Sequence, residues 1–532
     1  MITSASFGSW SSLFRSRRMA FSLRIAALSL LLLFVGYELF QNLLAAHAQY
    51  PPVHSTIFLD TIEPTFPLTT NSSHGTLAYS VANASGTTLT QGQIAVTDQQ
   101  TSLTLPRLPD DYYLLQVTDH TGQSPTSQTI PFVVLAPFSA QADSPLGMGV
   151  HFTGGNNPGL APLIAAMGAT TVRDDASWSL IERSRGNYSF NNFDTYMQTL
   201  QQNTLSPLLI LDYRNSFYDN NQTPYDNAGL RAFASYAQAL VTHYGPQLRA
   251  VEVYNEYNGT LSNGPCARNA ACYVNLLRYT YQAIKAVRPD VTVVGGAAFM
   301  NDTNWFTQVF KDGGLAYMDA LSDHPYTSFY IASPEIQGLE GSMLHLRQLM
   351  QQYNHGQAKP LWITELGWTT STLHVSEQTQ ANYVVRGTVL SLAAGAQKIF
   401  WYDFLNDGTD SFSVQQNFGL INRLNAQGLY TPKLAYAAYA VMARELAGRQ
   451  FIARESVAPG IFSMHFSGDL RVLWTTPVPQ SVALTTNNSL TLVSLSGHVE
   501  TLRPVNGQIV LHLSAQPLYI QGSISHISWH FL

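Results

Sequence analysis

Two glutamates each close a short apolar stretch that has the pattern of a buried β-strand. Glu256 ends the segment VEVYNE, in which Val251 and Val253 alternate toward a core, and Glu365 ends the segment LWITE. Parallel strands of a closed barrel bring their carboxyl ends to one rim, so the two carboxyl groups would face each other there. Such a pair can cleave an acetal, because one carboxyl protonates the leaving oxygen while the other, about 5 to 5.5 Å away, attacks the sugar carbon.

A single glutamate at the end of a strand is most often a solvated loop residue or a favourable charge at a helix N-terminus. The pair is harder to explain in this way. Each glutamate lies in an aromatic, weakly charged neighbourhood, and each falls at the same point of a repeating strand-helix unit. We therefore take Glu256 and Glu365 as the candidate catalytic residues.

The ends of the other predicted strands and the segments after them carry further side chains that we take as candidate substrate-binding residues: His151, Arg173, Asn255, His324, Tyr326, Trp368 and Trp401. The strand ends provide no serine on a nucleophile elbow and no cluster of metal ligands. The sequence therefore predicts a site that needs neither a metal ion nor another cofactor.

Two side chains are expected to keep Glu365 ionised. Arg173 would supply a positive charge and Tyr326 a hydroxyl donor, and both favour the charged form of a carboxyl group. The alternative for Arg173 is an ordinary ion pair with Asp174 or Asp212 inside the barrel.

Glu256 has a more apolar setting, beside Tyr254 and Tyr257, and is expected to act first as the acid and then as the base. Asn255 is expected to hydrogen-bond the 2-hydroxyl of the sugar, an interaction that tightens in the transition state.

Trp401 and Trp368 offer flat apolar faces on which sugar rings can stack. The alternative for Trp401 is packing in the core, and the alternative for His324 is a structural histidine whose hydrogen bonds are satisfied.

Eight apolar stretches alternate with amphipathic helices through the middle of the chain: residues 146–152, 170–173, 207–213, 250–256, 291–297, 318–323, 361–365 and 398–404. Eight such units in about 300 residues predict a (β/α)8 TIM barrel, an α/β fold, over residues 141–447. A doubly wound open sheet is the alternative, but it should carry a glycine-rich phosphate loop after its first strand. Residues 151–155, HFTGG, do not have that pattern.

Short alternating strands separated by turn residues flank the predicted barrel. Residues 49–140 are predicted to form a β-sandwich that acts as a spacer or lid, or alternatively binds carbohydrate. Residues 448–532 are predicted to form a second β-domain with a structural role, in which Asn506-Gly507 marks a hairpin turn.

The composition indicates an exported protein and argues against a nucleic-acid partner. The chain has 532 residues, of which 45% are hydrophobic but only 11% are charged, and its formal net charge is −6. The polar surface must therefore consist largely of uncharged side chains, and no basic run is present that would attract a phosphate backbone.

Residues 1–48 are predicted to be a signal peptide or a membrane anchor. Several arginines precede an apolar run at residues 25–36, which is short for a membrane span and suits a signal peptide. An Ala-x-Ala cleavage site follows at residues 46–48. Intervening apolar residues can instead prolong the helix, which would associate residues 19–46 with the membrane. Either way, we expect an extracytoplasmic protein that is secreted, periplasmic or anchored.

Cys266 and Cys272 are the only cysteines, and both lie in the loop after Glu256. In an oxidising compartment they would form a disulfide that stiffens this loop, and the alternative is two free thiols.

The strand-end residues resemble the retaining glycoside hydrolases of clan A: Asn255-Glu256, His324-Pro325-Tyr326, Glu365 and Trp401. A second set is similar to family 39, which includes β-xylosidases, α-L-iduronidases and endoglycosidases of exopolysaccharides: Val172 to Asp175, Trp178, Glu182, Gly186, Tyr188, Phe190 and Phe193-Asp194. The resemblance implies that Glu256 is the acid/base and Glu365 the nucleophile. It also implies contacts to the substrate or the nucleophile from Asn255, Arg173, Tyr326, His324 and Trp401. Many clan members have proline after the acid/base, where this chain has Tyr257.

The leading hypothesis is therefore an exported retaining glycoside hydrolase that acts on a polysaccharide or oligosaccharide without a cofactor. The alternative is a non-catalytic polysaccharide-binding or exopolysaccharide-assembly protein built on a barrel scaffold.

Overall fold

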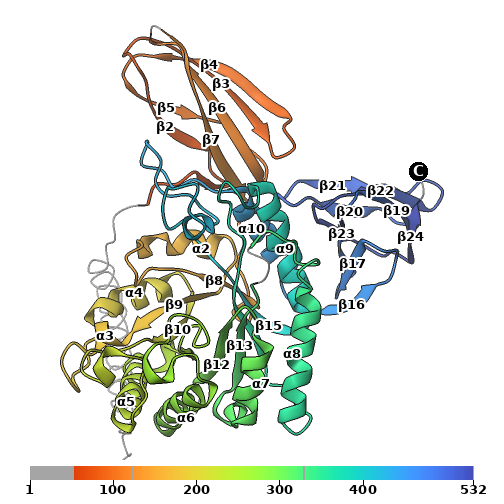
Figure 1. Cartoon of the computed structure of the whole chain (residues 1–532). Coiled ribbons are helices and arrows are strands. Elements are labelled where there is room, and N and C mark those ends of the chain that lie inside the picture. Colours follow the sequence, from red (N-terminus) through yellow and green to blue (C-terminus); the bar gives the residue numbers. More distant parts are fainter. Residues whose placement is uncertain (1–52, 123, 327–329, 531–532) are drawn as a thin grey trace, which may run out of the picture. The chain divides into compact units, whose positions relative to one another are not determined.

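Eight parallel strands close into a barrel in the computed structural model, which describes residues 53–122, 124–326 and 330–530 (Figure 1). The strands are β8 (Leu146–Gly149), β9 (Thr171–Ser177), β10 (Ser206–Asp212), β11 (Ala250–Val253), β12 (Thr292–Phe299), β13 (Ala320–His324), β14 (Leu361–Leu366) and β15 (Ala396–Trp401). They pair in sequence order, and β15 closes the barrel through β8. The predicted TIM barrel is confirmed.

Several barrel strands, β10 among them, are apolar on both faces, and both faces are buried. In β10, Leu208 points into the barrel, where it packs with Val294 and Phe400. The next residue, Leu209, points outward into the larger core between strands and helices. This alternation explains the nearly continuous apolar runs of parallel strands.

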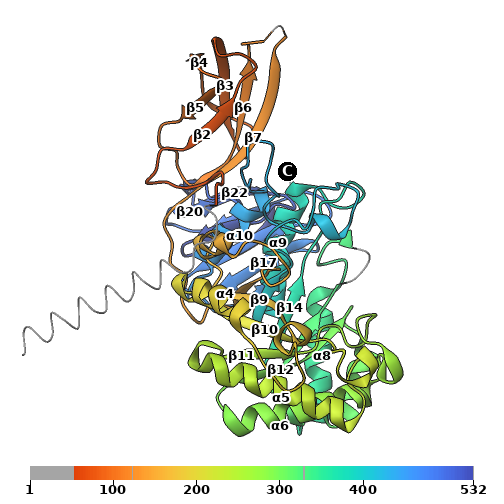
Figure 2. The ribbon, with the colours of Figure 1, turned by 90° about the vertical axis from the view of Figure 1, so that its left-hand side faces the viewer.

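The helices lie on the outside of the barrel strands (Figures 1 and 2). They are α2 (Ala161–Ala166), α3 (Trp178–Ile181), α4 (Asn191–Gln202), α5 (Asn227–Tyr244), α6 (Ala270–Val287), α7 (Thr303–Lys311), α8 (Leu339–Tyr353), α9 (Glu377–Ala393) and α10 (Leu434–Glu445). Several begin at side-chain caps. Asp226 accepts the Gly229 N–H at the start of α5, and Ser376 accepts the Thr379 N–H at the start of α9.

The residues that precede the barrel in the sequence form two sheets that pack together, and Figure 1 draws these sheets in red and orange. One has the order β1-β7-β6-β3-β4, and the other pairs β2 with β5. Their bounds are β1 (Ile57–Leu59), β2 (Thr65–Thr69), β3 (Gly75–Asn83), β4 (Thr88–Val96), β5 (Gln100–Thr104), β6 (Asp111–Asp119) and β7 (Thr126–Leu135). Phe66 of β2 packs against Leu115 and Phe132 in a shared core, so the N-terminal segment is the predicted sandwich.

Two further sheets follow the barrel, with the orders β16-β17-β18-β23-β20-β21 and β22-β19-β24. The strands are β16 (Phe451–Glu455), β17 (Ile461–Phe466), β18 (Leu470–Thr475), β19 (Gln480–Thr485), β20 (Leu490–Val493), β21 (Val499–Leu502), β22 (Gln508–Leu513), β23 (Leu518–Gln521) and β24 (His526–His530). Leu473, Val482 and Ile520 contribute to the core between the sheets. This is the predicted C-terminal β-domain.

The predicted signal peptide or anchor at residues 1–48 lies outside the described residues. Within the part of the chain that the structure describes, none of the helices has the length and apolar character needed to cross a membrane.

Candidate active site

Glu256 lies in a strained turn just beyond β11. Tyr254 and Glu256 both adopt left-handed backbone conformations, with φ of 69° and 48°. Such conformations are costly for residues other than glycine and persist only where the surroundings enforce them. Here the Glu256 N–H donates to the Ala297 carbonyl over 2.9 Å, so β12 helps to hold the turn.

A bulge in β12 directs that carbonyl toward the turn. The register between β12 and β13 shifts after Gly296, and the Ala297 N–H donates to the Ser322 Oγ atom over 2.7 Å instead of continuing the regular ladder. Bulges of this kind redirect the backbone beside functional sites. The position of Glu256 is therefore set by two neighbouring strands as well as its own.

Glu365 lies near the end of β14 with only 8% of its surface exposed. Arg173 Nη1 donates to Glu365 Oε1 over 2.8 Å, and the Tyr326 hydroxyl donates to Oε2 over 3.2 Å. Burial alone would raise the pKa of Glu365, but the nearby positive charges of His324 and Arg173 outweigh it and lower that pKa. The side chain is thus held as a carboxylate, with both partners that the sequence predicted.

Arg173 is also fixed by two further acceptors. Its Nε donates to Glu252 over 2.6 Å, and its Nη2 donates to Asn255 Oδ1 over 2.8 Å. Glu252 is fully buried inside β11, where a carboxylate needs a paired charge. Glu252 was not among the predicted site residues, although an acid in the middle of a buried apolar strand can indicate a paired charge.

His324 lies between the two candidate catalytic residues. Its Nδ1 is 3.0 Å from Glu256 Oε1 and 3.7 Å from Glu365 Oε2, while its Nε2 is 3.0 Å from Thr364 Oγ1. Burial opposes the charged form of the ring, but the carboxylates of Glu365 and Glu256 raise the pKa of His324 above its ordinary value. His324 therefore lies beside both candidate catalytic residues.

The carboxyl groups of Glu256 and Glu365 face each other. One oxygen of each lies within 4.8 Å of the other and of a His324 ring nitrogen. An approach this short agrees with the roughly 5 to 5.5 Å of retaining glycosidases rather than with the 6.5 Å or more that an inverting enzyme needs. The same three side chains have the spacing of metal ligands, but a cation there would compete with Arg173 for Glu365.

A cleft opens above the two glutamates. Aromatic side chains form much of its wall: Tyr213, Phe299, Tyr326, Tyr330, Tyr402 and Phe418. Polar side chains complete it: His151, Arg173, Asp175, Asn255, Glu256, Glu365 and Gln415. Asn255, a predicted site residue, also contacts the aromatic wall, because its Nδ2 donates to the Tyr213 hydroxyl over 3.1 Å. The aromatic surface and polar groups together suit a sugar.

His151 lies at the cleft, with its Nε2 3.3 Å from the Tyr402 hydroxyl. The same atom is 3.7 Å from Asp403 Oδ2 and 3.8 Å from Asp407 Oδ2. These three side chains form a second group with metal-ligand spacing. Of the three, His151 lines the cleft, where its ring can donate or accept a hydrogen bond with a sugar hydroxyl.

The prediction that Trp401 and Trp368 stack on sugar rings is wrong. Each is only 1% exposed, and their rings stack on each other with centroids 5.7 Å apart. The register between β14 and β15 shifts near their ends, and Tyr402 rather than Trp401 enters the cleft. Core packing, the alternative for Trp401, is what the structure has.

The expected surroundings of Glu256 also need correction. Tyr254 and Tyr257 pack into the core outside the cleft, where the Tyr254 hydroxyl lies 2.9 Å from Thr223 Oγ1 and the Tyr257 ring contacts Tyr273. Both rings are buried, and neither lines the cleft that contains Glu256. Aromatic surface near Glu256 comes instead from other elements that line the cleft.

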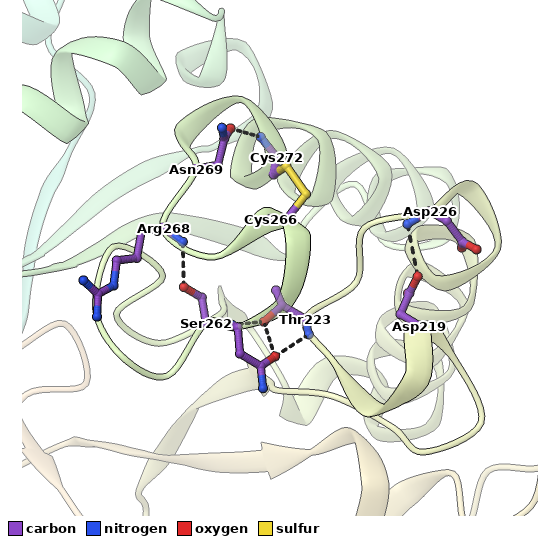
Figure 3. Close-up of a disulfide and its surroundings, with 9 residues drawn as sticks. Asp219, Thr223, Asp226, Ser262, Cys266, Arg268, Asn269 and Cys272 are labelled. Carbon is purple, nitrogen blue, oxygen red and sulfur yellow. Dashed lines mark hydrogen bonds between the residues drawn. A yellow bond between two sulfur atoms is a disulfide. The ribbon is translucent and has the colours of Figure 1, made fainter.

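A disulfide joins Cys266 and Cys272 in the loop after Glu256, with their Cα atoms 5.6 Å apart (Figure 3). It links the loop to the first turn of α6, where the Cys272 N–H donates to the Asn269 side chain over 3.0 Å. Ser262 Oγ also accepts from the Arg268 N–H over 2.9 Å. The disulfide and these hydrogen bonds therefore hold the end of the loop that lies farther along the chain from Glu256.

Residues 227–425 match the family model of the glycosyl hydrolase catalytic core. This range contains Asn255, Glu256, His324, Tyr326 and Glu365. No curated protein matches the chain.

Solved structures of glycoside hydrolases are similar to this fold. A family 39 glycoside hydrolase from the gut symbiont Bacteroides cellulosilyticus WH2 has a TM-score of 0.74 at 22% identity, covering 89% of this chain and 100% of its own. A monomeric β-xylosidase from Caulobacter crescentus CB15 has a TM-score of 0.50 at 17% identity, covering 72% and 96%. A family 30 subfamily 8 xylanase from Clostridium acetobutylicum has a TM-score of 0.51 at 12% identity, again covering 72% and 96%.

The predicted resemblance to clan A glycoside hydrolases, and to family 39 among them, is thus confirmed at the level of the fold. The catalytic-core match agrees with the predicted class of enzyme, an O-glycosyl hydrolase. The first of the similar structures also covers most of the sheets on either side of the barrel, since 89% of this chain is included.

Proposed function

We propose that this protein is a retaining glycoside hydrolase in which Glu365 is the nucleophile and Glu256 the acid/base. The observation that carries the proposal is the approach of the two carboxyl groups to within 4.8 Å at the base of one cleft. The assignment of roles rests on Arg173 and Tyr326, which both donate to Glu365 and favour its ionised form.

In the first step, a carboxylate oxygen of Glu365 attacks the anomeric carbon while Glu256 gives its proton to the departing glycosidic oxygen. The bond to the leaving group breaks, and a covalent glycosyl-enzyme forms. In the second step, Glu256 takes a proton from water, whose oxygen attacks the same carbon and releases Glu365. The Asn255 side chain is held by Arg173 and Tyr213, and its second N–H suits the sugar 2-hydroxyl.

The proposed substrate is a polysaccharide or oligosaccharide outside the cytoplasm. The Cys266–Cys272 disulfide supports an oxidising compartment, and the arginine-led apolar run at the N-terminus supports export. Whether that run is removed or retained as an anchor can be tested by fractionating cells that express the whole chain.

The test begins with a panel of nitrophenyl glycosides and polysaccharides. Glu365→Ala should reduce turnover by roughly 10⁴-fold or more, and azide should restore part of it by forming a glycosyl azide of inverted configuration. Glu256→Ala with azide should give the retained configuration, since the covalent intermediate still forms. Glu500→Ala, at an exposed glutamate of β21, is the matched control. Undiminished turnover in Glu365→Ala, or glycan binding without hydrolysis by the wild type, would contradict the proposal.

A further inference from the structure

Residues 330–338, between β13 and α8, form part of the cleft wall through Tyr330. The Tyr330 ring contacts Tyr326 and Phe418 edge to face, with centroid distances of 5.1 and 5.2 Å. Tyr330 lines the same cleft as Glu256 and Glu365, and burial together with these two carboxylates raises the pKa of its hydroxyl. The position of this segment therefore shapes the space above the two glutamates.

Glu335 anchors the segment to the barrel. Arg386 of α9 donates from Nε to Glu335 Oε1 over 2.8 Å and from Nη2 to Oε2, so the pair is bidentate. The side chains are only 2% and 9% exposed, respectively. A buried carboxylate of this kind depends on its partners, because removing one leaves charge without compensation.

A third donor to Glu335 comes from the C-terminal β-domain. Trp474 of β18 donates from Nε1 to Glu335 Oε1 over 2.9 Å. The Trp474 ring is fully buried and stacks on Phe462 of β17, with centroids 4.9 Å apart and planes 5° from parallel. Arg386 Nη1 also donates to the Ala515 carbonyl of the same domain over 3.3 Å. The domain thus contributes to both sides of the Glu335 ion pair.

Trp368 holds the same segment at a second point. Its Nε1 donates to the Ala332 carbonyl over 3.0 Å, and Trp368 lies three positions after Glu365 in the sequence. One tryptophan therefore ties the segment to the nucleophile strand, and the other ties it to the C-terminal β-domain. This explains why Trp368 is buried although it follows a catalytic residue.

We propose that Trp474 is a positioning residue, which holds residues 330–338 through Glu335 and so sets the place of Tyr330 in the substrate cleft. The C-terminal β-domain then has a role in substrate binding, beyond the structural role expected from its sequence. The positioning itself is independent of the proposed glycosidase activity, and only its effect on catalysis rests on that function.

Trp474→Phe tests the positioning directly, because phenylalanine retains a ring to stack on Phe462 and lacks the N–H. Hydrogen exchange measured by mass spectrometry should show amides of residues 330–338 exchanging roughly tenfold faster than in wild type, as expected for loss of a hydrogen bond to a charged group. Arg471→Lys is the matched control, since Arg471 is also on β18 but donates to Glu455. Equal exchange in wild type and Trp474→Phe would overturn the proposal, whether or not the protein hydrolyses glycans.

Kinetics then test the effect on the site with the most rapidly cleaved nitrophenyl glycoside of the panel. Trp474→Phe should raise KM by several-fold with a smaller change in kcat, while Arg471→Lys leaves both unchanged. Glu335→Gln should raise KM as well, and adding Trp474→Phe to it should have little further effect if the tryptophan acts through Glu335. Independent, additive effects of the two changes, or an unchanged KM in Trp474→Phe, would contradict the proposed route. A wild type without turnover would contradict the glycosidase assignment alone.

Discussion

Arg173 and Glu365 are 192 residues apart in the sequence, yet the guanidinium donates to the carboxylate over 2.8 Å inside the barrel. The arginine is itself held by Glu252, so its position does not depend on substrate. For the nucleophile role proposed for Glu365, a carboxylate that is already ionised and oriented needs little reorganisation during attack, which is the basis of electrostatic preorganisation. The effect of these neighbours on Glu365 can therefore be measured by replacing single residues.

Tyr326→Phe removes the hydroxyl that donates to Glu365 and keeps the ring. A hydrogen bond to a charged group contributes about 1.5 to 3 kcal/mol, so kcat/KM should fall roughly 10- to 100-fold. The pKa of Glu365 is lowered in the folded protein, and loss of a donor should raise it. The acid limb of the pH profile should therefore move to higher pH, which a series of kcat/KM measurements would detect. An unmoved acid limb would show that this hydroxyl does not stabilise the ionised nucleophile.

The pKa of His324 should lie above the ordinary histidine value, because the carboxylates of Glu365 and Glu256 raise it against the effect of burial. A raised pKa stabilises the fold fully below the unfolded-state pKa, and this contribution disappears as pH rises through the folded-state pKa. NMR titration of the ring should show a lower pKa in Glu365→Gln than in wild type. As pH rises through the folded-state pKa of His324, the unfolding free energy of Glu365→Gln should fall less than that of the wild type. Identical ring titrations would refute the coupling between His324 and Glu365.

Gly296→Ala should disrupt the bulge that supports Glu256. Gly296 has φ of 110°, and a Cβ atom there would lie 2.5 Å from the Ser322 carbonyl oxygen. We expect a loss of roughly 2 kcal/mol or more in unfolding free energy, together with lower kcat, because the Ala297 carbonyl must move. Gly295→Ala is the control, since its Cβ would meet side chains of Met318 and Leu277 that can shift. Denaturant unfolding would give the unfolding free energy of both variants, and kinetics would give their kcat. Equal losses in Gly296→Ala and Gly295→Ala would argue against a special role for the bulge.

The sequence was sufficient to find the barrel and most of the polar site, because both depend on strand ends. The apolar runs located all eight strands, and a closed parallel sheet then brings Arg173, Asn255, Glu256, His324 and Glu365 to one rim. Tyr326 also follows from this logic, since it comes two residues after β13.

Details that depend on backbone irregularity could not be predicted in the same way. Trp401 and Tyr402 are adjacent, and which of them enters the cleft is decided by the shifted register of β14 and β15. Tyr330 and Phe418 come from segments without hydrophobic periodicity, so no pattern placed them beside Glu256. An acid inside a buried strand, such as Glu252, can be recognised in the sequence, but its partner Arg173 lies on another strand, and strand patterns do not identify that long-range contact.

Replacing both cysteines of the disulfide, Cys266→Ser with Cys272→Ser, should destabilise the loop after Glu256. Closing so short a loop contributes about 2 kcal/mol by the chain-entropy estimate. Thermal unfolding should therefore begin at a lower temperature, and a thiol reductant should lower the wild-type midpoint while leaving the variant unchanged. Activity should be largely retained, because Ser262 Oγ still donates to the Tyr257 carbonyl and accepts from the Arg268 N–H. A reductant-insensitive wild type would argue against a disulfide in the protein as made.

The charges at the cleft predict that neutral sugars are better substrates than uronic acids. Asp175 and the ionised Glu365 line it, and among the described lining residues Arg173 is the only lysine or arginine, with its guanidinium already bonded to Glu365 and other acceptors. Placing a further carboxylate among like charges costs several kcal/mol, so kcat/KM for a nitrophenyl glucuronide should be at least roughly 100-fold below that for the matching glucoside. Higher salt should reduce the difference in kcat/KM between the two substrates, because salt screens the repulsion between carboxylates. A glucuronide cleaved as fast as the glucoside would contradict this prediction.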